Sequence, residues 1–233
     1  MDSPLWKNDE ELFSIARQEL FVALVGDILD QLGYVKQFIG PEIKPVAVEM
    51  IVIGRAKTIV ECDVEKIPQS IITNNKKVAK PFGLIFEALD SLKENEVYIC
   101  DGGSLEYAQW GGLMSTRAMC LKGAGAVVNS YHRDTNEILK LKFPTFSRGS
   151  YAQDQGPRGK VIDYDCPITF NGIRVHPGDV VYGDRDGVVI VPKDVVVPAF
   201  TGAIEKARGE KEVLKALQKG MSTEDAFEHF GIM

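Results

Sequence analysis

Residues 109–137 read QWGGLMSTRAMCLKGAGAVVNSYHRDTNE, and this stretch decides the predicted fold. The pair Gly111-Gly112 opens a segment with helical spacing of apolar residues, which ends at Gly123. The apolar run Ala126 to Val128 then predicts a buried strand. A further apolar run, Glu96 to Cys100, precedes the whole stretch and also predicts a strand. A strand, a loop, a helix and a second strand in this order indicate an α/β core.

The segments before this stretch alternate in the same way. Apolar residues recur every three to four positions between Asp9 and Leu32, which predicts one or two amphipathic helices. Val48 to Val60 is rich in β-branched residues and predicts a strand, in which Gly54 marks a bulge or a close backbone approach. Pro81 to Leu92 has helical spacing.

After Pro144 the pattern predicts a β-rich half and then helices. Short strands are expected at Lys160–Ile162, Pro167–Phe170, Ile173–Val175, Val180–Tyr182 and Val188–Val191. Helical spacing returns from Lys193 to His229 and is broken at Gly220. We therefore predict an α/β domain over residues 1–192 and a C-terminal helical extension over residues 193–233.

Composition excludes several classes of protein. The 233 residues are 45% hydrophobic and 26% charged, which is ordinary for a globular chain. A net charge of −6 and a pI near 5.2 lack the basic footprint of a nucleic-acid-binding protein. No apolar run approaches the roughly 20 residues of a membrane span. We expect a soluble protein with no nucleic-acid or membrane partner.

The N-terminus and the cysteines predict a reducing compartment. Met1-Asp2-Ser3-Pro4 carries no basic region followed by an apolar one, so a cytoplasmic location is the default expectation. The four cysteines, Cys62, Cys100, Cys120 and Cys166, lie far apart without a C-x-x-C pair. We expect them to be reduced and mostly buried, and we expect no zinc site.

Chemistry is expected where the two predicted strands end. Free N–H groups at a helix N-terminus favour a small anion, and Gly112, Leu113 and Met114 would supply them. The alternative is that Gly111 and Gly112 only make a tight turn.

Arg133 and Asp134 follow the second strand and are expected to emerge at its edge. Arg133 offers a planar fork for a carboxylate, and Asp134 offers a hard oxygen ligand that suits Mg²⁺. The alternative is a surface ion pair beside a turn. Asp101, before Gly102-Gly103, is a candidate for proton transfer or water positioning, with a turn aspartate as its alternative. The triplet His132-Arg133-Asp134 is not a kinase motif, because the other kinase motifs are missing.

Gly112, twenty residues, and then Arg133-Asp134-Thr135-Asn136-Glu137 resembles the G-x20-R-D-x2-E/D motif of the RraA-like superfamily. Its enzymatic branch contains the class II 4-hydroxy-4-methyl-2-oxoglutarate aldolases. The resemblance covers most of the chain, and further matches lie at Gly26-Asp27, Gly54-Arg55-Ala56, Asp101-Gly102-Gly103 and Pro177-Gly178-Asp179. One departure is Asn129-Ser130-Tyr131-His132, where the family more often has a small turn that contains glycine.

The resemblance implies an α/β sandwich related to the swivelling β/β/α domain, assembled as a homotrimer or homohexamer with active sites between subunits. It implies that Asp134 anchors Mg²⁺ or Mn²⁺ through water, that Arg133 binds substrate, and that the amides of Gly112 to Met114 bind a carboxylate. Asp101 is similar to an aspartate that handles a catalytic water. Glu210 or Glu212 would be the C-terminal acid that reaches the neighbouring site.

Three functional hypotheses follow. The first is a metal-dependent lyase that releases pyruvate from a 2-oxo acid by retro-aldol cleavage or by oxaloacetate decarboxylation, with the metal as the electron sink. The second is a non-catalytic, protein-binding regulator of RNA processing, like the ribonuclease E inhibitor branch of the superfamily. That branch typically lacks the aspartate after the arginine and the C-terminal extension, so Asp134 and the tail from Lys193 favour the enzyme. The third is a lyase or hydratase acting on a sugar acid.

Overall fold

The computed structural model describes residues 5–231. These residues form two compact units, a helical unit of residues 5–35 and 194–231 and an α/β unit of residues 36–193. The helical unit thus takes its residues from both ends of the chain, and the predicted boundary after residue 192 stays a prediction. Residues 1–4 and 232–233, which include the N-terminal residues interpreted above and the ends of both predicted domains, lie outside the described residues.

The α/β unit is built on one large sheet. Its strands are β1 (Lys44–Pro45), β2 (Val52–Asp63), β3 (Glu96–Gly102), β5 (Gly125–Val128), β7 (Thr145–Ser147), β8 (Gly159–Tyr164), β11 (Val180–Gly183) and β12 (Val188–Val191). They follow the order β1-β7-β5-β3-β2-β11-β12, and β8 also pairs with β2. The pairs β2–β3, β3–β5 and β5–β7 are parallel, and the other pairs are antiparallel.

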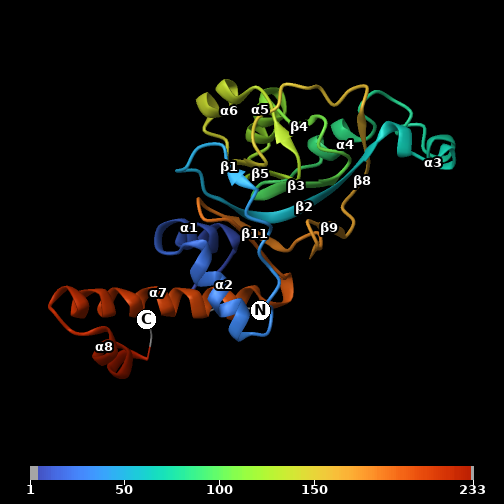
Figure 1. Cartoon of the computed structure of the whole chain (residues 1–233). Coiled ribbons are helices and arrows are strands. Elements are labelled where there is room, and N and C mark those ends of the chain that lie inside the picture. Colours follow the sequence, from blue (N-terminus) through green and yellow to red (C-terminus); the bar gives the residue numbers. More distant parts are fainter. Residues whose placement is uncertain (1–4, 232–233) are drawn as a thin grey trace. The chain divides into compact units, whose positions relative to one another are not determined.

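Smaller elements complete this unit. A parallel pair joins β4 (Ala108–Trp110) to β6 (Tyr131–His132), and an antiparallel hairpin joins β9 (Ile168–Phe170) to β10 (Ile173–Val175). The helices are α3 (Gln69–Asn74), α4 (Ile85–Asp90), α5 (Gly112–Cys120) and α6 (Thr135–Leu141), with 3-10 turns at Val64–Lys66 and Lys193–Val195. In Figure 1, α4, α5 and α6 lie on one face of the curled sheet.

The predicted α/β fold is confirmed, and the differences have local causes. Gly54 marks a close backbone approach, because an added Cβ would lie 2.4 Å from the carbonyl oxygen of Asn95. The bulge of β2 lies instead between Val60 and Glu61. The helix predicted from Pro81 begins only at Ile85, because Phe82 and Gly83 both have a φ of 63°.

The core explains why the central strands have no alternating pattern. All four residues of β5 are buried, as are residues 97–100 of β3. Strands in a parallel sheet covered on both faces consist of continuous apolar runs. Trp110 packs beside this core, with its ring 4.9 Å from that of Tyr98 and 6.0 Å from that of Phe143. Burying one such side chain contributes roughly 1.5 to 3 kcal/mol.

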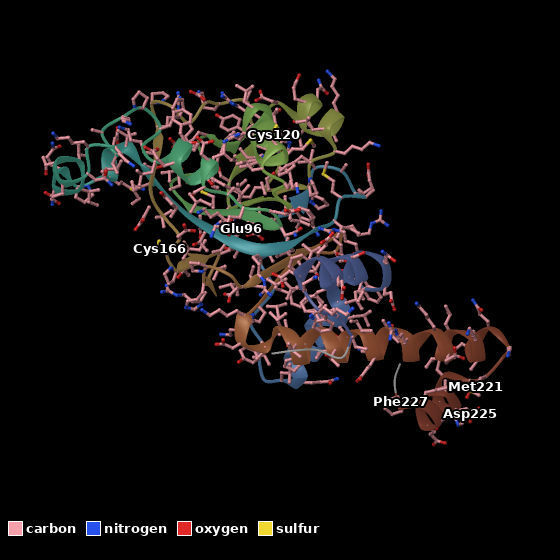
Figure 2. The ribbon with its side chains drawn as sticks, turned by 180° about the vertical axis from the view of Figure 1, so that it is seen from behind. Glu96, Cys120, Cys166, Met221, Asp225 and Phe227 are labelled. Atoms are coloured by element: carbon pink, nitrogen blue, oxygen red, sulfur yellow. The ribbon has the colours of Figure 1, made fainter. Side chains whose placement is uncertain are left out.

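The helical unit contains α1 (Asp9–Glu19), α2 (Val22–Gln31), α7 (Val196–Gln218) and α8 (Thr223–Phe230). The helix predicted between Asp9 and Leu32 is two helices, and the C-terminal break at Gly220 is confirmed. Gly202 lets α7 lie close to α2, because an added Cβ would be 3.0 Å from Ile28 Cγ2. Ser222 caps α8 by accepting from the Asp225 N–H at 3.0 Å, and Figure 2 labels Asp225 on this helix. Within residues 5–231, no helix combines the length and the apolar character needed to cross a membrane.

All four cysteines lie in the described part of the chain, and none forms a disulfide there. Cys100 is buried, and Cys62 and Cys166 are partly exposed. The expectation of mostly buried cysteines is wrong for Cys120, which is exposed in the last turn of α5 (Figure 2).

Candidate functional site

A short parallel strand pair brings the two ends of the glycine–arginine–aspartate motif together. Trp110 of β4 lies opposite His132 of β6, and the Arg133 N–H donates to the Trp110 carbonyl oxygen at 2.9 Å. Gly112 begins α5 directly after β4, and Asp134 directly precedes α6 after β6. Twenty residues separate the motif's ends because the chain passes through α5 and β5 before β6 pairs with β4.

Asp134 occupies a special backbone position. Its φ of 57° and ψ of 41° lie in the left-handed region, which aspartate tolerates better than most residues. Its Oδ2 accepts from the Gly112 N–H at 3.0 Å. A carboxylate at a helix N-terminus is favoured by the helix dipole, so this contact orients the side chain. The contact also occupies one of the three amides predicted to bind a carboxylate, and the amides of Leu113 and Met114 follow it in the first turn of α5.

The glycine pair serves close packing rather than an unusual turn. Gly111 has an extended backbone with φ of −159°, and Gly112 is helical. An added Cβ on Gly112 would lie 2.9 Å from Glu137 Cβ and 3.2 Å from Asp134 Cβ. The N-termini of α5 and α6 approach so closely that only glycine fits at position 112. The tight-turn alternative does not include this packing role.

Arg133 is held between two carboxylates. Its Nη1 lies 2.8 Å from Asp154 Oδ1, and its Nε lies 4.0 Å from Asp134 Oδ2. All three side chains are about 40% exposed, so water screens these ion pairs. The sequence-based prediction missed Asp154, because this residue lies in an irregular loop and no motif marks it.

These residues line part of a cavity of about 270 Å³. The rest of its wall is mostly apolar, and its lining residues are Phe82, Ile85, Phe86, Ala108, Gln109, Trp110, Gly111, Leu113, Met114, Arg133, Asp134, Asp154 and Gln155. Arg133 and Asp134 also border a second hollow of about 280 Å³, formed with Thr135, Ser150, Tyr151 and Ala152. The side chain of Asp134, 44% exposed, thus has room around it for solvent and an ion.

A buried carboxyl group lies behind the cavity. Gln155, a lining residue, donates from Nε2 to Glu61 Oε1 at 2.8 Å. Burial raises the pKa of Glu61 well above its usual value, and the charge of nearby Asp63 adds to this effect. The buried environment therefore favours the protonated form of Glu61. No sequence motif marks Glu61, because it is a single glutamate in a strand rich in β-branched residues.

His132 supports the motif without facing the cavity. The buried ring contacts Ser147 Oγ at 2.7 Å through Nδ1 and Thr135 Oγ1 at 3.1 Å through Nε2. Burial lowers the pKa of this histidine, which keeps the ring neutral. It ties the segment before Arg133 to β7 and to the first residue of α6.

Asp101 does not line the cavity that contains Arg133. Its Oδ1 accepts from the Gly102 N–H at 2.6 Å and from Asn129 Nδ2 at 2.8 Å, and its Oδ2 accepts from the Asn171 N–H at 3.2 Å. These contacts are those of an aspartate that holds turns in place. They fit the turn alternative, and a catalytic role for Asp101 stays a prediction.

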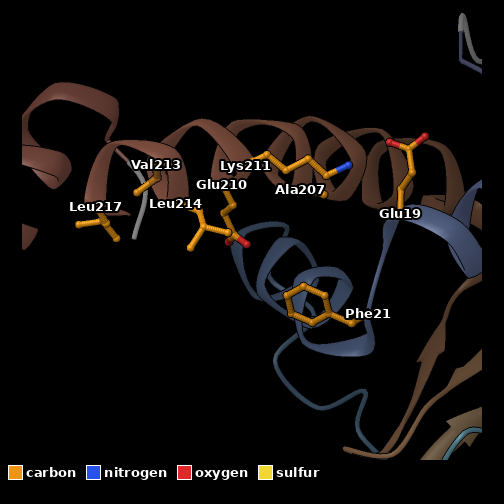
Figure 3. Close-up of a pocket in the computed structure, with 8 residues that line it drawn as sticks. All are labelled: Glu19, Phe21, Ala207, Glu210, Lys211, Val213, Leu214 and Leu217. Carbon is orange, nitrogen blue, oxygen red and sulfur yellow. The ribbon is translucent and has the colours of Figure 1, made fainter. Parts of the chain in front are cut away.

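Glu210 lies on α7, in the helical unit. Figure 3 shows it beside a mostly apolar groove that also includes Glu19, Phe21 and Leu214. Its Oε1 is 3.8 Å from Lys206 Nζ, whereas Glu212 pairs with Lys215 at 2.7 Å. Whether either acid reaches a neighbouring site stays a prediction.

The carboxylates at the cavity fit a hydrated hard cation. Among residues 5–231, no three His, Cys, Asp or Glu side chains are grouped so as to hold a metal directly. Both protein contacts of the Asp134 carboxylate involve Oδ2, and Oδ1 has no protein partner in the described part of the chain. Mg²⁺ keeps several waters and is usually held by one or two carboxylates together with substrate, so Asp134 suits it.

The family model described as "RraA-like: Aldolase/RraA" matches residues 22–190. The chain belongs to the RraA-like family. The match includes the whole Gly112–Asp134 arrangement, and the family resemblance inferred from the motif is confirmed.

Three relatives show how far this likeness extends. Protein DlpA of Legionella pneumophila is 26% identical over 209 residues, which are 89% of this chain but only 32% of that protein. A Bacillus cereus protein named "Putative 4-hydroxy-4-methyl-2-oxoglutarate aldolase" is 34% identical over 113 residues, 48% of this chain and 70% of its own length. The crystal structure of Streptomyces coelicolor RraAS2, an RNase ES inhibitor family member, has a TM-score of 0.71 at 19% identity and covers 94% of this chain and all of its own. The last of these supports the RraA-like fold alone.

Proposed function

We propose that this chain is a divalent-metal-dependent carbon–carbon lyase that releases pyruvate from a 2-oxo acid. The observation that carries the proposal is the convergence of Arg133 and Asp134 on one cavity at the N-terminus of α5. The aldolase names of relatives that match half of this chain support the same reaction class. A homotrimeric or homohexameric assembly and a cytoplasmic location stay predictions.

Asp134 would hold Mg²⁺ or Mn²⁺ through water, with Oδ2 fixed by the Gly112 N–H and Oδ1 left for the hydrated ion. When bound, such a cation supplies Lewis acidity to the 2-oxo oxygen, where negative charge develops as the carbon–carbon bond breaks. Both retro-aldol cleavage and loss of CO₂ from oxaloacetate place charge on the same oxygen. One site therefore suffices for both reactions.

Arg133 would bind the substrate's anionic end. Its pairing with Asp154 holds the guanidinium at the cavity wall, and the substrate carboxylate competes with Asp154 for the same donors. A single hydrogen-bond donor such as Arg133, aimed at the oxygen on which negative charge develops, contributes roughly 3 to 4 kcal/mol to catalysis. The Leu113 and Met114 amides at the start of α5 add positive potential where this helix borders the cavity.

The test is pyruvate release from oxaloacetate and from 4-hydroxy-4-methyl-2-oxoglutarate, with Mg²⁺, with Mn²⁺ and with excess chelator, corrected for the reaction without enzyme. We expect turnover that requires the metal and is lost in Asp134→Asn. Asp165→Asn is the matched control, because Asp165 is also an aspartate with left-handed φ of 56° in an ion pair, with Lys57 at 2.7 Å, but it does not line the cavity. Absence of enzyme-dependent pyruvate with either metal would overturn the proposal and favour a protein-binding regulator.

A further inference from the structure

The lining of the cavity combines charged and apolar side chains. The charged residues are Arg133, Asp134 and Asp154. The other lining side chains include Phe82, Ile85 and Phe86 from α4 and the segment before it, and Leu113 and Met114 from the first turn of α5. A ligand held at Arg133 would therefore also contact apolar side chains.

Large apolar side chains at this wall remain in contact with water. Phe86 is 59% exposed and Leu113 is 86% exposed. The rings of Phe82 and Phe86 meet edge to face, with 6.0 Å between their centroids. Covering such side chains with an apolar group is favourable, because it removes apolar surface from water.

The charge of the wall disfavours a second anionic group. Among the described residues that line the cavity, Arg133 is the only cation, and Asp154 already contacts it at 2.8 Å. A substrate with one carboxylate uses this guanidinium. A second carboxylate that lies against Phe82, Ile85 and Phe86 finds no cation among the described lining residues, whereas an apolar group there covers exposed apolar surface.

We propose that the site takes 2-oxo monocarboxylic acids with an apolar far end, such as an aryl or branched alkyl group, in preference to 2-oxo diacids. This inference rests on the proposed lyase function and narrows its substrate class. For 4-hydroxy-4-phenyl-2-oxobutanoate, the C3–C4 bond breaks and the C4 hydroxyl loses its proton to become the carbonyl of benzaldehyde. The electron pair left on C3 takes up a proton, which yields pyruvate.

The experiment compares this substrate with 4-hydroxy-2-oxoglutarate, which carries a carboxylate in place of the phenyl ring. Pyruvate is measured by chromatography with Mg²⁺ and Mn²⁺ on the full chain. We expect kcat/KM to be at least ten-fold higher for the phenyl substrate. Phe86→Arg, which places a cation among the apolar lining side chains, should lower this ratio at least ten-fold.

Phe227→Arg is the matched control, because Phe227 is 57% exposed on α8 and does not line this cavity (Figure 2). It should leave the ratio unchanged. A higher kcat/KM for the diacid in the unmodified protein would overturn the inference and leave the lyase function standing, whatever the variants do. No cleavage of either substrate with either metal, together with no pyruvate from oxaloacetate, would overturn the lyase function itself.

Discussion

Gly112→Ala tests whether the close approach of α5 and α6 builds the site. The added Cβ would lie 2.9 Å from Glu137 Cβ and 3.2 Å from Asp134 Cβ, well inside normal contact distance. Relieving this overlap costs about 1 to 3 kcal/mol. Weakening the bond between the Gly112 N–H and Asp134 Oδ2 adds about 1 kcal/mol, and the better helix propensity of alanine returns up to about 1 kcal/mol. The expected net loss in the free energy of unfolding is about 2 kcal/mol.

Thermal unfolding measures this loss as a fall in Tm of about 4 to 8 °C, taking about 2 to 4 °C for each kcal/mol in a unit of this size. Gly187→Ala is the control in the same unit, because an added Cβ there meets nothing within 4 Å and φ is not positive. We expect it to change Tm by less than 2 °C. Equal Tm values for the two variants would refute the packing explanation of Gly112.

Three further outcomes are expected. Because the pKa of Glu61 is raised in the folded state, the folded chain keeps a proton that the unfolded chain releases above the ordinary pKa of 4.5. Stability therefore falls as pH rises, by up to about 1.4 kcal/mol per pH unit. Glu61→Gln should remove this dependence of the free energy of unfolding on pH, measured by urea unfolding between pH 5 and 8, and should be more stable than the unmodified protein at pH 8. An unchanged pH dependence would contradict the raised pKa of Glu61. Because burial lowers the pKa of His132, the unfolded chain takes up a proton below 6.5 that the folded chain does not, so stability should fall as pH drops below 6.5. His132→Gln should show a smaller fall in the same titration, and an equal fall would place the effect elsewhere. Asp134→Ala removes both the acceptor for Gly112 and the tolerance of left-handed backbone, so its free energy of unfolding should drop by about 2 to 3 kcal/mol, against less than about 1 kcal/mol for Asp134→Asn. Equal losses in the two variants, measured by urea unfolding, would show that the hydrogen bond and backbone preference contribute nothing.

Two features of the structure could not be read from the sequence pattern. The helix expected from Pro81 is cut short by two residues with left-handed backbone, Phe82 and Gly83, and only Gly83 is of a type that suggests such a conformation. Asp101 carries the same glycine signal as a loop aspartate at an active site, but its oxygens bond to Asn129 and Asn171, far away in sequence.

The α/β class, the family and the longer helices and strands were determined by the sequence itself, because spacing of apolar residues and the Gly112-to-Asp134 motif are local properties of the chain. The short strands β1, β4, β6 and β7 and the helices α3 and α6 were not predicted. The partners of the motif were decided only by the tertiary structure. Asp154 pairs with Arg133, and Gln155 bonds Glu61 across 94 residues, because folding brings their segments to one cavity. Such pairings depend on which surfaces pack together, and periodicity along the chain contains no information on that.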